Sequence, residues 1–207
     1  MPWRNGRGTT LEIAREPAAG EEFAWRLGLA DIAEDGDFSA YPGYSRALAL
    51  VAGESLQLRF RGRGRCFLDP ARRGTRFEGD WETHCAIPKG HCTDLSLIVR
   101  RSSTARVAIA VHAPRVLRLE ATRQVLASRD LYSALFVLDG SVAITESTRG
   151  RARHARTRDT ILLFPGPREI ITLSSLGRSP AQLIVLRWRI GNPDARAVRD
   201  TAAISRR

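Results

Sequence analysis

Short apolar stretches separated by turn residues run along this chain and predict an all-β protein. Residues 25–30, Trp-Arg-Leu-Gly-Leu-Ala, alternate with the period of two that is typical of a half-buried strand. A Thr-Thr-Leu-Glu-Ile strand signal ends at Ile13, and any helix in the first half is expected to be short. Further strands are predicted at residues 47–51, 55–60, 66–68, 76–77, 95–99, 105–111, 117–125, 131–138, 141–144, 160–164, 170–173 and 183–190.

The turns suggest that one pattern occurs twice. Asp139-Gly140 is a tight-hairpin dipeptide between two apolar runs, and Ala52-Gly53-Glu54 lies between two similar runs in the first half. Two all-β units fit this pattern better than one open sheet with long exposed edges. We expect barrels at residues 1–112 and 113–191 and a polar tail with no need to pack at 192–207. An arrangement in which the N-terminal strand crosses over to the second barrel is left open.

Length and composition fit a soluble globular chain. The 207 residues can bury a substantial core, and 43% hydrophobic with 27% charged residues is an ordinary balance. There is no run of eighteen or more apolar residues, and the start lacks the apolar core of a signal peptide. We therefore expect a cytoplasmic protein with no membrane partner.

The net charge of +11 raises the question of nucleic acid. Lys89 is the only lysine, so the excess consists of arginine, spread along the chain as a GC-rich genome would place it. No helix-turn-helix, RNA-binding or zinc-finger motif accompanies it. Nucleic-acid binding therefore stays an alternative that rests on charge alone.

Cysteine and histidine give little support for catalysis or metal binding. Cys66, Cys85 and Cys92 form no C-x-x-C pair and are interpreted as small buried hydrophobes. The hairpin-dense pattern suggests barrels of the cupin type, whose metal-binding members carry two histidines one residue apart. No H-x-H occurs here, since the four histidines are the isolated His84, His91, His112 and His154. We expect no metal, no cofactor and no catalytic residue.

The N-terminal stretch looks structured. Trp3 precedes the turn cluster Asn5-Gly6-Arg7-Gly8, whose glycines allow positive φ or close backbone approach. Such a turn would fray unless it docked on the fold. It is predicted to form one wall of a small-molecule pocket.

Several spaced motifs, dense in the first half of the chain, together resemble the HutD/Ves family. They are Pro2-Trp3-Arg4-Asn5-Gly6 with Gly8, Thr10, Glu12 and Ile13; Trp25-Arg26 and Ala30-Asp31; Phe38-Ser39-Ala40-Tyr41-Pro42-Gly43 with Arg46; Phe77-x-Gly79-Asp80; and Asp94-Leu95 ahead of Arg100-Arg101. The resemblance implies a bicupin, two jelly-roll-like β-barrels packed in one chain, without the usual metal ligands. It also implies an association with histidine utilisation, where limiting or sensing intermediates such as formylglutamate has been proposed. Arg7, Gly28 and Ser96 depart from the family pattern, so the ligand here could differ.

Arginines within or beside apolar runs supply an independent argument for a binding site. Arg26 lies within an apolar strand, where a charge needs a partner or a cavity, and Arg46 leads into another. The planar guanidinium suits bidentate capture of a carboxylate. The alternative is that Arg26 and Arg46 form structural ion pairs with Asp31 and Asp94, and that Trp3 belongs to the core. The predicted ligand-binding set is Trp3, Asn5, Gly6, Gly8, Thr10, Arg26, Ser39, Arg46, Asp94 and Arg100.

The sequence thus predicts a metal-independent bicupin that binds a small anionic metabolite of histidine degradation, a formylglutamate-like carboxylate, as a regulator or sensor. The first alternative is a metal-free isomerase or hydrolase acting on a similar acid, with Asp94, Glu12 and His84 as candidate acids and bases. The second is the nucleic-acid-binding regulator. A homodimer is left open.

Overall fold

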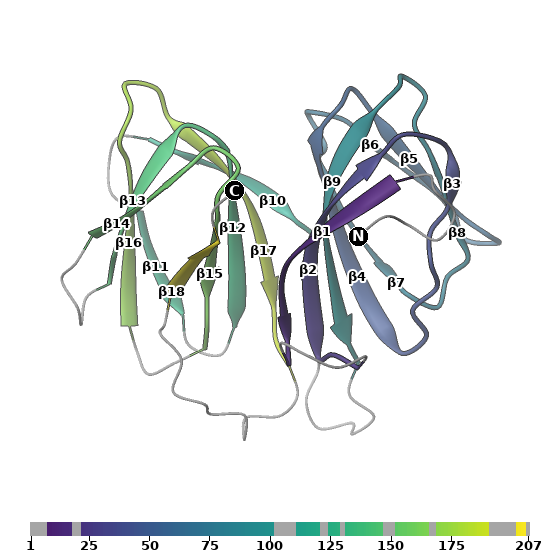
Figure 1. Cartoon of the computed structure of the whole chain (residues 1–207), viewed down its shortest axis with the longest axis horizontal. Coiled ribbons are helices and arrows are strands. Elements are labelled where there is room, and N and C mark those ends of the chain that lie inside the picture. The colour runs from purple at the N-terminus through teal and green to yellow at the C-terminus, as the bar shows by residue number, and fades with distance from the viewer. Residues whose placement is uncertain are drawn as a thin grey trace. The chain divides into compact units, whose positions relative to one another are not determined.

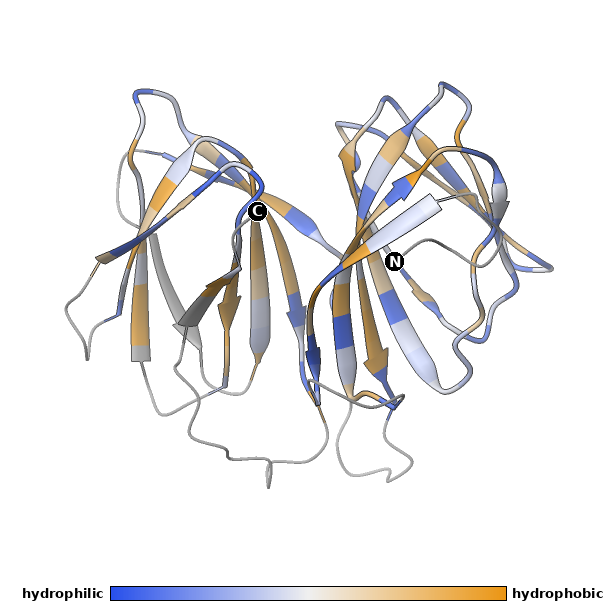
Figure 2. Cartoon of the chain, viewed as in Figure 1, coloured by the Kyte–Doolittle hydropathy of each residue, from blue (hydrophilic) through white to orange (hydrophobic). Residues whose placement is uncertain are grey.

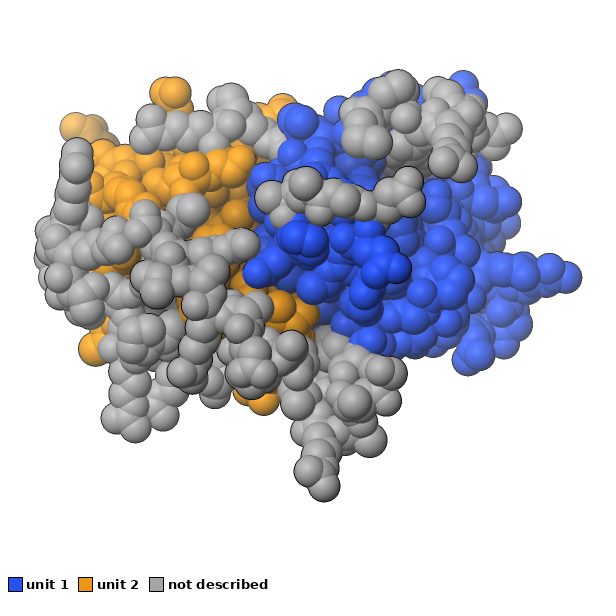
Figure 3. Space-filling view, turned by 60° about the horizontal axis from the view of Figure 1, so that its bottom comes forward, with its two compact units in different colours: residues 1–114 blue, residues 115–207 orange. Residues whose placement is uncertain are grey.

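The protein is all-β in its described part, as the hydrophobic pattern predicts. The computed structural model describes residues 8–17, 22–101, 111–120, 124–128, 131–146, 152–165, 169–190 and 202–205, and these contain strands and turns but no helix. The chain divides into two compact units, unit 1 (residues 1–114) and unit 2 (residues 115–207) (Figures 1 and 3). The predicted strand at 105–111 falls almost wholly outside the described residues.

Unit 1 consists of two sheets. Sheet I has the order β1-β2-β9-β4-β7 and sheet II the order β3-β8-β5-β6 (Figure 1). The strands are β1 (Gly8–Glu16), β2 (Trp25–Ile32), β3 (Gly36–Asp37), β4 (Tyr44–Ala52), β5 (Leu56–Phe60), β6 (Gly64–Leu68), β7 (Gly74–Glu78), β8 (Thr83–Ala86) and β9 (Cys92–Arg100). The N-terminal strand β1 pairs antiparallel with β2, inside unit 1.

Unit 2 repeats this topology. Sheet III has the order β10-β17-β12-β15-β18 and sheet IV the order β11-β16-β13-β14. The strands are β10 (Arg115–Leu119), β11 (Gln124–Ser128), β12 (Tyr132–Asp139), β13 (Ser141–Glu146), β14 (Ala152–Arg156), β15 (Thr160–Leu163), β16 (Glu169–Ser175), β17 (Ala181–Trp188) and β18 (Ala202–Ser205). Strands β10 to β17 take the places of β2 to β9 in the same order. Eight strands in two four-stranded sheets with this crossover order form a jelly roll, and each unit adds one further edge strand.

The two glycine turns noted in the sequence occupy equivalent places. Gly53 follows β4 and Gly140 follows β12, with φ of 102° and 88°, the left-handed region that favours glycine. A Cβ on Gly53 would lie 2.7 Å from Cys92 Cβ, and one on Gly140 would lie 3.1 Å from Ala181 Cβ. Cys92 and Ala181 begin β9 and β17, so the same turn packs against the same strand in both units.

Each unit buries its own apolar core, and Figure 2 shows hydrophobic positions concentrated on the strands of both. The unit 1 core joins the facing sides of sheets I and II and consists of Ile32, Leu48, Leu50, Leu56, Leu58, Phe60, Leu68, Phe77, Cys85, Ile87 and Cys92. The unit 2 core consists of Leu119, Leu135, Val137, Val142, Ile144, Ala155, Ile161, Leu163, Ile171, Leu173, Ala181 and Leu183. The side of sheet I that carries Leu48 and Leu50 is called its inner face below.

The expected polar tail differs from the structure in one part. The sequence predicts that residues 192–207 do not pack, but Ala202–Ser205 form β18, which pairs with β15 at the edge of sheet III. Ile204 lies opposite Ile161 and packs against the unit 2 core. This strand pairs an edge that would otherwise leave backbone groups unpaired, and Ile204 supplies the apolar contact.

Candidate functional site

The inner face of sheet I carries the candidate site in three cross-strand rows, read from the pairing of β1, β2, β9 and β4. The first row is Thr10, Ala30, Asp94 and Leu50; the second is Glu12, Gly28, Ser96 and Leu48; the third is Arg26, Ile98, Arg46 and, on β7, Phe77. Because rows follow every second residue, neighbouring rows lie about 7 Å apart. Polar and charged side chains thus share a face with the core residues Leu48, Leu50 and Phe77.

Arg46 is buried among aromatic rings. Its side chain is 7% exposed, and its guanidinium carbon lies 5.0 Å from the ring centres of both Phe38 and Phe77 and 5.5 Å from that of Tyr41. Nη1 donates a hydrogen bond of 3.2 Å to the Ser39 carbonyl oxygen, whereas the buried Nε has no partner. Burial lowers the pKa of Arg46, and Asp94 opposes this effect. A desolvated cation with an open donor is suited to receive a carboxylate.

Asp94 and Ser96 lie on β9 on the same inner face as this arginine, two rows and one row away from it, and each has an orphaned atom. Asp94 is 1% exposed, and neither its Oδ1 nor the buried Ser96 Oγ has a hydrogen-bond partner. Burial raises the pKa of Asp94 to about 7, while Arg46 pulls it down and Asp31 adds to the rise. Across the described residues, no ion pair within 4.0 Å joins Asp94 to Arg46. Three unpartnered polar atoms on one inner face are unusual for a packed interior.

The ion pairs expected under the structural alternative are absent among the described residues. Arg26 instead pairs with Glu12 across β1 and β2, with Nε and Oε2 3.3 Å apart. Asp31 accepts a hydrogen bond of 2.7 Å from the Thr93 hydroxyl. Arg26 therefore has a carboxylate partner, whereas Arg46 has none.

The loop that supplies Ser39 and Tyr41 is held by the turn after β7. Tyr41 N–H donates to the Gly79 carbonyl at 2.8 Å, and Gly79 N–H donates to the Tyr44 carbonyl at 2.7 Å. Asp80 accepts a hydrogen bond of 3.2 Å from Gly43 N–H, and Arg101 N–H donates 2.8 Å to the Gly43 carbonyl. The Phe77-x-Gly79-Asp80 motif is thus a structural clasp on the residues that surround Arg46.

Of the remaining predicted ligand-binding residues, some lie near Asp94 and others do not. Thr10 lies in the row of Asp94, and Gly8 is buried at the start of β1 opposite Ile32. Arg100 lies six residues beyond Asp94, about 20 Å along the strand, where it bonds to Glu22 at 3.0 Å and to the Tyr44 hydroxyl. The structure does not bring Arg100 together with Asp94. Trp3, Asn5 and Gly6 lie outside the described residues, as does Arg7.

Unit 2 has no such cluster at the equivalent place. Leu50 opposite Asp94 in unit 1 corresponds to Val137 opposite Leu183 in unit 2, by distance from the glycine turns. Val137 and Leu183 both belong to the apolar core of unit 2. The jelly roll therefore accepts an aliphatic side chain where unit 1 places Asp94, so the buried carboxylate is not a requirement of the fold.

The described residues contain no group of three or more His, Cys, Asp or Glu side chains that could hold a metal ion. His84 lies on the outer side of β8 and contacts Asp37, with Nδ1 2.7 Å from Oδ1. Burial raises the pKa of the Cys85 thiol, and raises that of Cys92 to about 12, which disfavours the reactive thiolate of either. In the same part of the chain there is no helix long and apolar enough to cross a membrane.

Sequence reasoning missed part of this arrangement. The sequence identified Ser96 only as a departure from a family pattern, yet Ser96 lies between Asp94 and the row of Arg46. The aromatic rings around Arg46 come from a loop and from β7, so period-two reasoning within one strand could not assemble them. Gly28, another departure, lies directly beside Ser96 in the middle row.

Jelly-roll topology in both units, with a polar cluster inside the first, defines a cupin-like protein. A cupin 2 conserved barrel domain protein from Leptotrichia buccalis has this fold, with a TM-score of 0.54, 7% identity and coverage of 89% of both chains. The HutD family model matches residues 1–178, so the chain belongs to the HutD family.

Two relatives specify this membership. The structure of HutD from Pseudomonas fluorescens SBW25 matches with a TM-score of 0.70 and 26% identity, over 91% of this chain and 93% of that one. A Pseudomonas putida protein, described as an uncharacterized 21.2 kDa protein in the hutC 3′ region, is 37% identical over 99 residues, 47% of this chain and 52% of the relative. The chain thus spans about half the length of the curated relatives it matches.

Proposed function

We propose that the protein binds a small carboxylate metabolite inside unit 1, with Arg46 as the residue that receives the carboxylate. The observation that carries the proposal is the buried guanidinium whose Nε has no hydrogen-bond partner and which has no carboxylate within 4.0 Å among the described residues. A buried cation without a direct carboxylate partner is costly, so an anionic ligand would stabilise it. The aliphatic pair at the equivalent place in unit 2 supports a role for the charges beyond folding.

The metabolite belongs to histidine degradation and resembles formylglutamate, and the protein acts as a regulator or sensor of that pathway. The family name and the position of the P. putida relative in a hutC 3′ region support this assignment. Orphaned Asp94 Oδ1 and Ser96 Oγ supply polar contacts for a second group on the ligand, such as an amide or a hydroxyl.

The test is a thermal-shift series with formylglutamate, formiminoglutamate, urocanate, imidazolone propionate, histidine and glutamate, followed by calorimetric titration of any acid that shifts the melting temperature. A ligand that binds only the native state at a hundred times its Kd stabilises the protein by about 2.7 kcal/mol. No shift with any of the six would remove the histidine link.

Variants then locate the site. Arg46→Met keeps most of the buried volume and removes the charge, and it should weaken acid binding at least tenfold. Arg65→Gln is the matched control, because Arg65 is exposed on β6. Arg26→Ala should weaken binding less than Arg46→Met, since Arg26 already pairs with Glu12. Equal affinity in Arg46→Met and wild type, with a normal melting curve, would exclude this site.

A metal-free enzyme is the second candidate function, and one observation favours it. Burial raises the pKa of Asp94 to about 7, although Arg46 opposes the rise, and such a pKa suits a general acid or base at neutral pH. Of the other two candidates, Glu12 pairs with Arg26 and His84 with Asp37. Proton NMR of the binding acid during long incubation would separate the two functions: a new product signal that Asp94→Asn loses means catalysis, and an unchanged spectrum means binding alone.

A further inference from the structure

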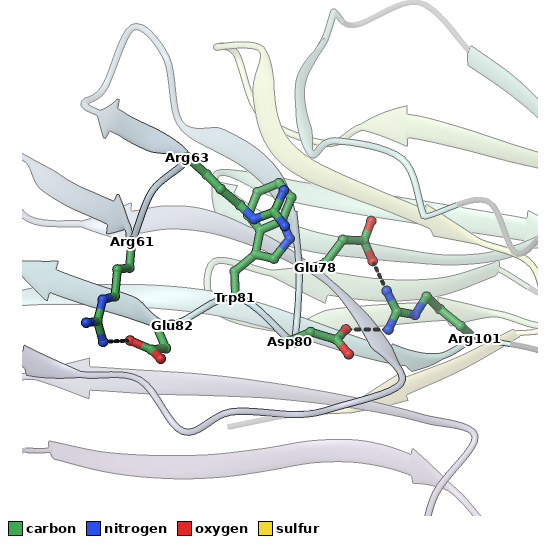
Figure 4. A pocket seen from close by; sticks show the side chains of 7 residues that line it. All are labelled: Arg61, Arg63, Glu78, Asp80, Trp81, Glu82 and Arg101. Atoms are coloured by element: carbon green, nitrogen blue, oxygen red, sulfur yellow. Dashed lines mark hydrogen bonds and ion pairs between the residues drawn. The ribbon is translucent and has the colours of Figure 1, made fainter.

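A cavity opens on unit 1, separate from the buried cluster. It has a volume of about 410 Å³ and is lined by Arg61, Arg63, Glu78, Asp80, Trp81, Glu82 and Arg101 (Figure 4). Arg61 and Arg63 come from the β5–β6 hairpin, Arg101 follows β9, and the others come from the end of β7 and the turn after it. A space of this size suits a small molecule.

All three carboxylates of this cavity already have cationic partners. Glu82 pairs with Arg61 at 2.8 Å, while Arg101 bridges Glu78, at 3.1 Å, and Asp80 (Figure 4). Glu78 also accepts a hydrogen bond of 2.6 Å from the Ser45 hydroxyl. These acids are therefore satisfied and hold the walls in place.

Arg63 is the cation that remains. Its guanidinium carbon lies 5.1 Å from the centre of the Trp81 ring, and among the described residues no carboxylate lies within 4.0 Å of it. Figure 4 shows the guanidinium lying over the indole, apart from the two ion-paired groups. The lining is neutral overall: Arg101 is shared by two carboxylates, which leaves that group with one negative charge, while Arg63 is exposed, lies over the indole and carries its positive charge without a carboxylate partner in the described part of the chain.

The two groups are held by defined local structure. Arg63 N–H donates to the Phe60 carbonyl at 2.9 Å in a turn where Gly62 has a φ of 68°, so a glycine there favours the hairpin. Trp81 packs edge-on against Phe60 at 5.2 Å, and its carbonyl accepts a hydrogen bond of 2.8 Å from the Thr83 hydroxyl. The cation and the ring are thus presented together, as binding of an organic anion requires.

We infer that this cavity is a second binding site, for a small organic oxyanion whose carboxylate or phosphate pairs with Arg63 while its body contacts Trp81. Arginine offers a fork of donors that fits either headgroup. The carboxylates of Glu78, Asp80 and Glu82 also line the cavity and would repel an extended polyanion. The ligand therefore carries a single anionic group. The site is distinct from the buried cluster because Phe60 lies between Trp81 and Phe77, the ring that contacts Arg46.

The test uses three probes with one ring and different headgroups: benzoate, phenyl phosphate and neutral benzamide. Each is titrated at constant ionic strength into the full-length chain, and the indole N–H signal of Trp81 is followed by NMR after its assignment with Trp81→Phe. We expect a saturable shift with benzoate or phenyl phosphate and none with benzamide. The anion that binds more tightly identifies the headgroup class.

Arg63→Gln should weaken that binding at least tenfold without changing the melting temperature, whereas Arg59→Gln on β5 should leave it unchanged. Absence of a saturable shift, an equal response to benzamide, or unchanged binding in Arg63→Gln would overturn the site. Arg46→Met should retain it; loss of binding in that variant would mean one site rather than two. If no metabolite binds at Arg46, the titrations with benzoate and phenyl phosphate still test the cavity at Arg63, so the two proposals are tested separately.

Discussion

At the scale of single residues, the feature that sets unit 1 apart is a pair of buried opposite charges that do not form a contact pair. Asp94 and Arg46 interact through space, and each keeps an unpartnered polar atom on the inner face of sheet I. Burial costs both ions hydration, and the attraction between them returns only part of it. Unit 1 thus carries a destabilising arrangement at a place where unit 2 has aliphatic side chains. Such a loss of stability is common at binding sites.

Asp94→Asn should make stability less dependent on pH. The folded pKa of Asp94 is about 7, against about 3.9 in an unfolded chain. Between these values the folded protein binds the additional proton, so the contribution of Asp94 to stability is greatest at low pH and falls as pH rises from about 4 to about 7. The melting temperature of Asp94→Asn, relative to wild type, should therefore be higher at pH 8 than at pH 4.5.

Denaturant unfolding at the two pH values would give the size of this effect, which is on the order of a few kcal/mol. Asp139→Asn is a matched control, because Asp139 is exposed at the end of β12 and asparagine also suits the turn before Gly140. A difference between Asp94→Asn and wild type that stays constant from pH 4.5 to pH 8 would show that Asp94 titrates normally.

At the scale of elements, the candidate site depends on how the Ser39–Tyr44 loop is clasped to the turn after β7. Backbone hydrogen bonds join Tyr41 and Tyr44 to Gly79, and Asp80 accepts one from Gly43. The close approach leaves no room for a side chain at Gly79, since a Cβ there would lie 2.9 Å from the Tyr44 carbonyl oxygen. Sequence motifs that look like separate family signatures are therefore the two halves of one clasp.

Gly79→Ala should destabilise unit 1 by about 1–3 kcal/mol, the range for forced overpacking, and should weaken carboxylate binding by moving Ser39 and Tyr41. Gly177→Ala is the control, because the nearest atom to a Cβ there is the Ser179 carbonyl oxygen at an ordinary 3.5 Å. Melting curves and titrations of both variants decide the point. A Gly79→Ala protein as stable as wild type would show that the loop can shift without loss.

Strand prediction succeeds where the apolar run is long and fails where it is short or polar. Residues 47–51 and 131–138 correspond closely to β4 and β12. By contrast, β14 has the sequence Ala-Arg-His-Ala-Arg and escapes prediction, because pairing with β13 rather than its own hydrophobicity makes it a strand. The apolar run at 117–125 contributes to two strands, since residues 117–119 belong to β10 and residues 124–125 to β11, in different sheets.

At the scale of the whole molecule, the same jelly-roll topology holds a buried polar cluster in unit 1 and aliphatic side chains at the equivalent place in unit 2. Unit 2 has the aliphatic side chains of Val137 and Leu183 where unit 1 places the charge of Asp94. Arginines occur in both units, and some of them form ion pairs, for example Arg61 with Glu82 and Arg118 with Glu120. The net charge of +11 by itself therefore identifies no partner.

Chelation should leave both stability and carboxylate binding unchanged, because the proposed contacts are made by Arg46, Asp94 and Ser96 alone. Dialysis against EDTA, followed by melting and titration with the same acid, checks this expectation. Apoprotein reloaded with zinc or iron serves as the comparison. A fall in affinity after chelation that metal restores would mean that a metal ion takes part in binding.

The strand-rich class, the two glycine turns and the residue types suited to a carboxylate could be read from the sequence. Alternation, turn chemistry and a charge within an apolar run are local properties, so they are visible along one chain. Which charges meet depends on the tertiary fold: Arg26 pairs with Glu12, Arg100 pairs with Glu22, and Arg46 lies among three aromatic rings with no carboxylate partner in the described part of the chain. Strand register and sheet order set those distances, and they are fixed by packing between segments far apart in the sequence.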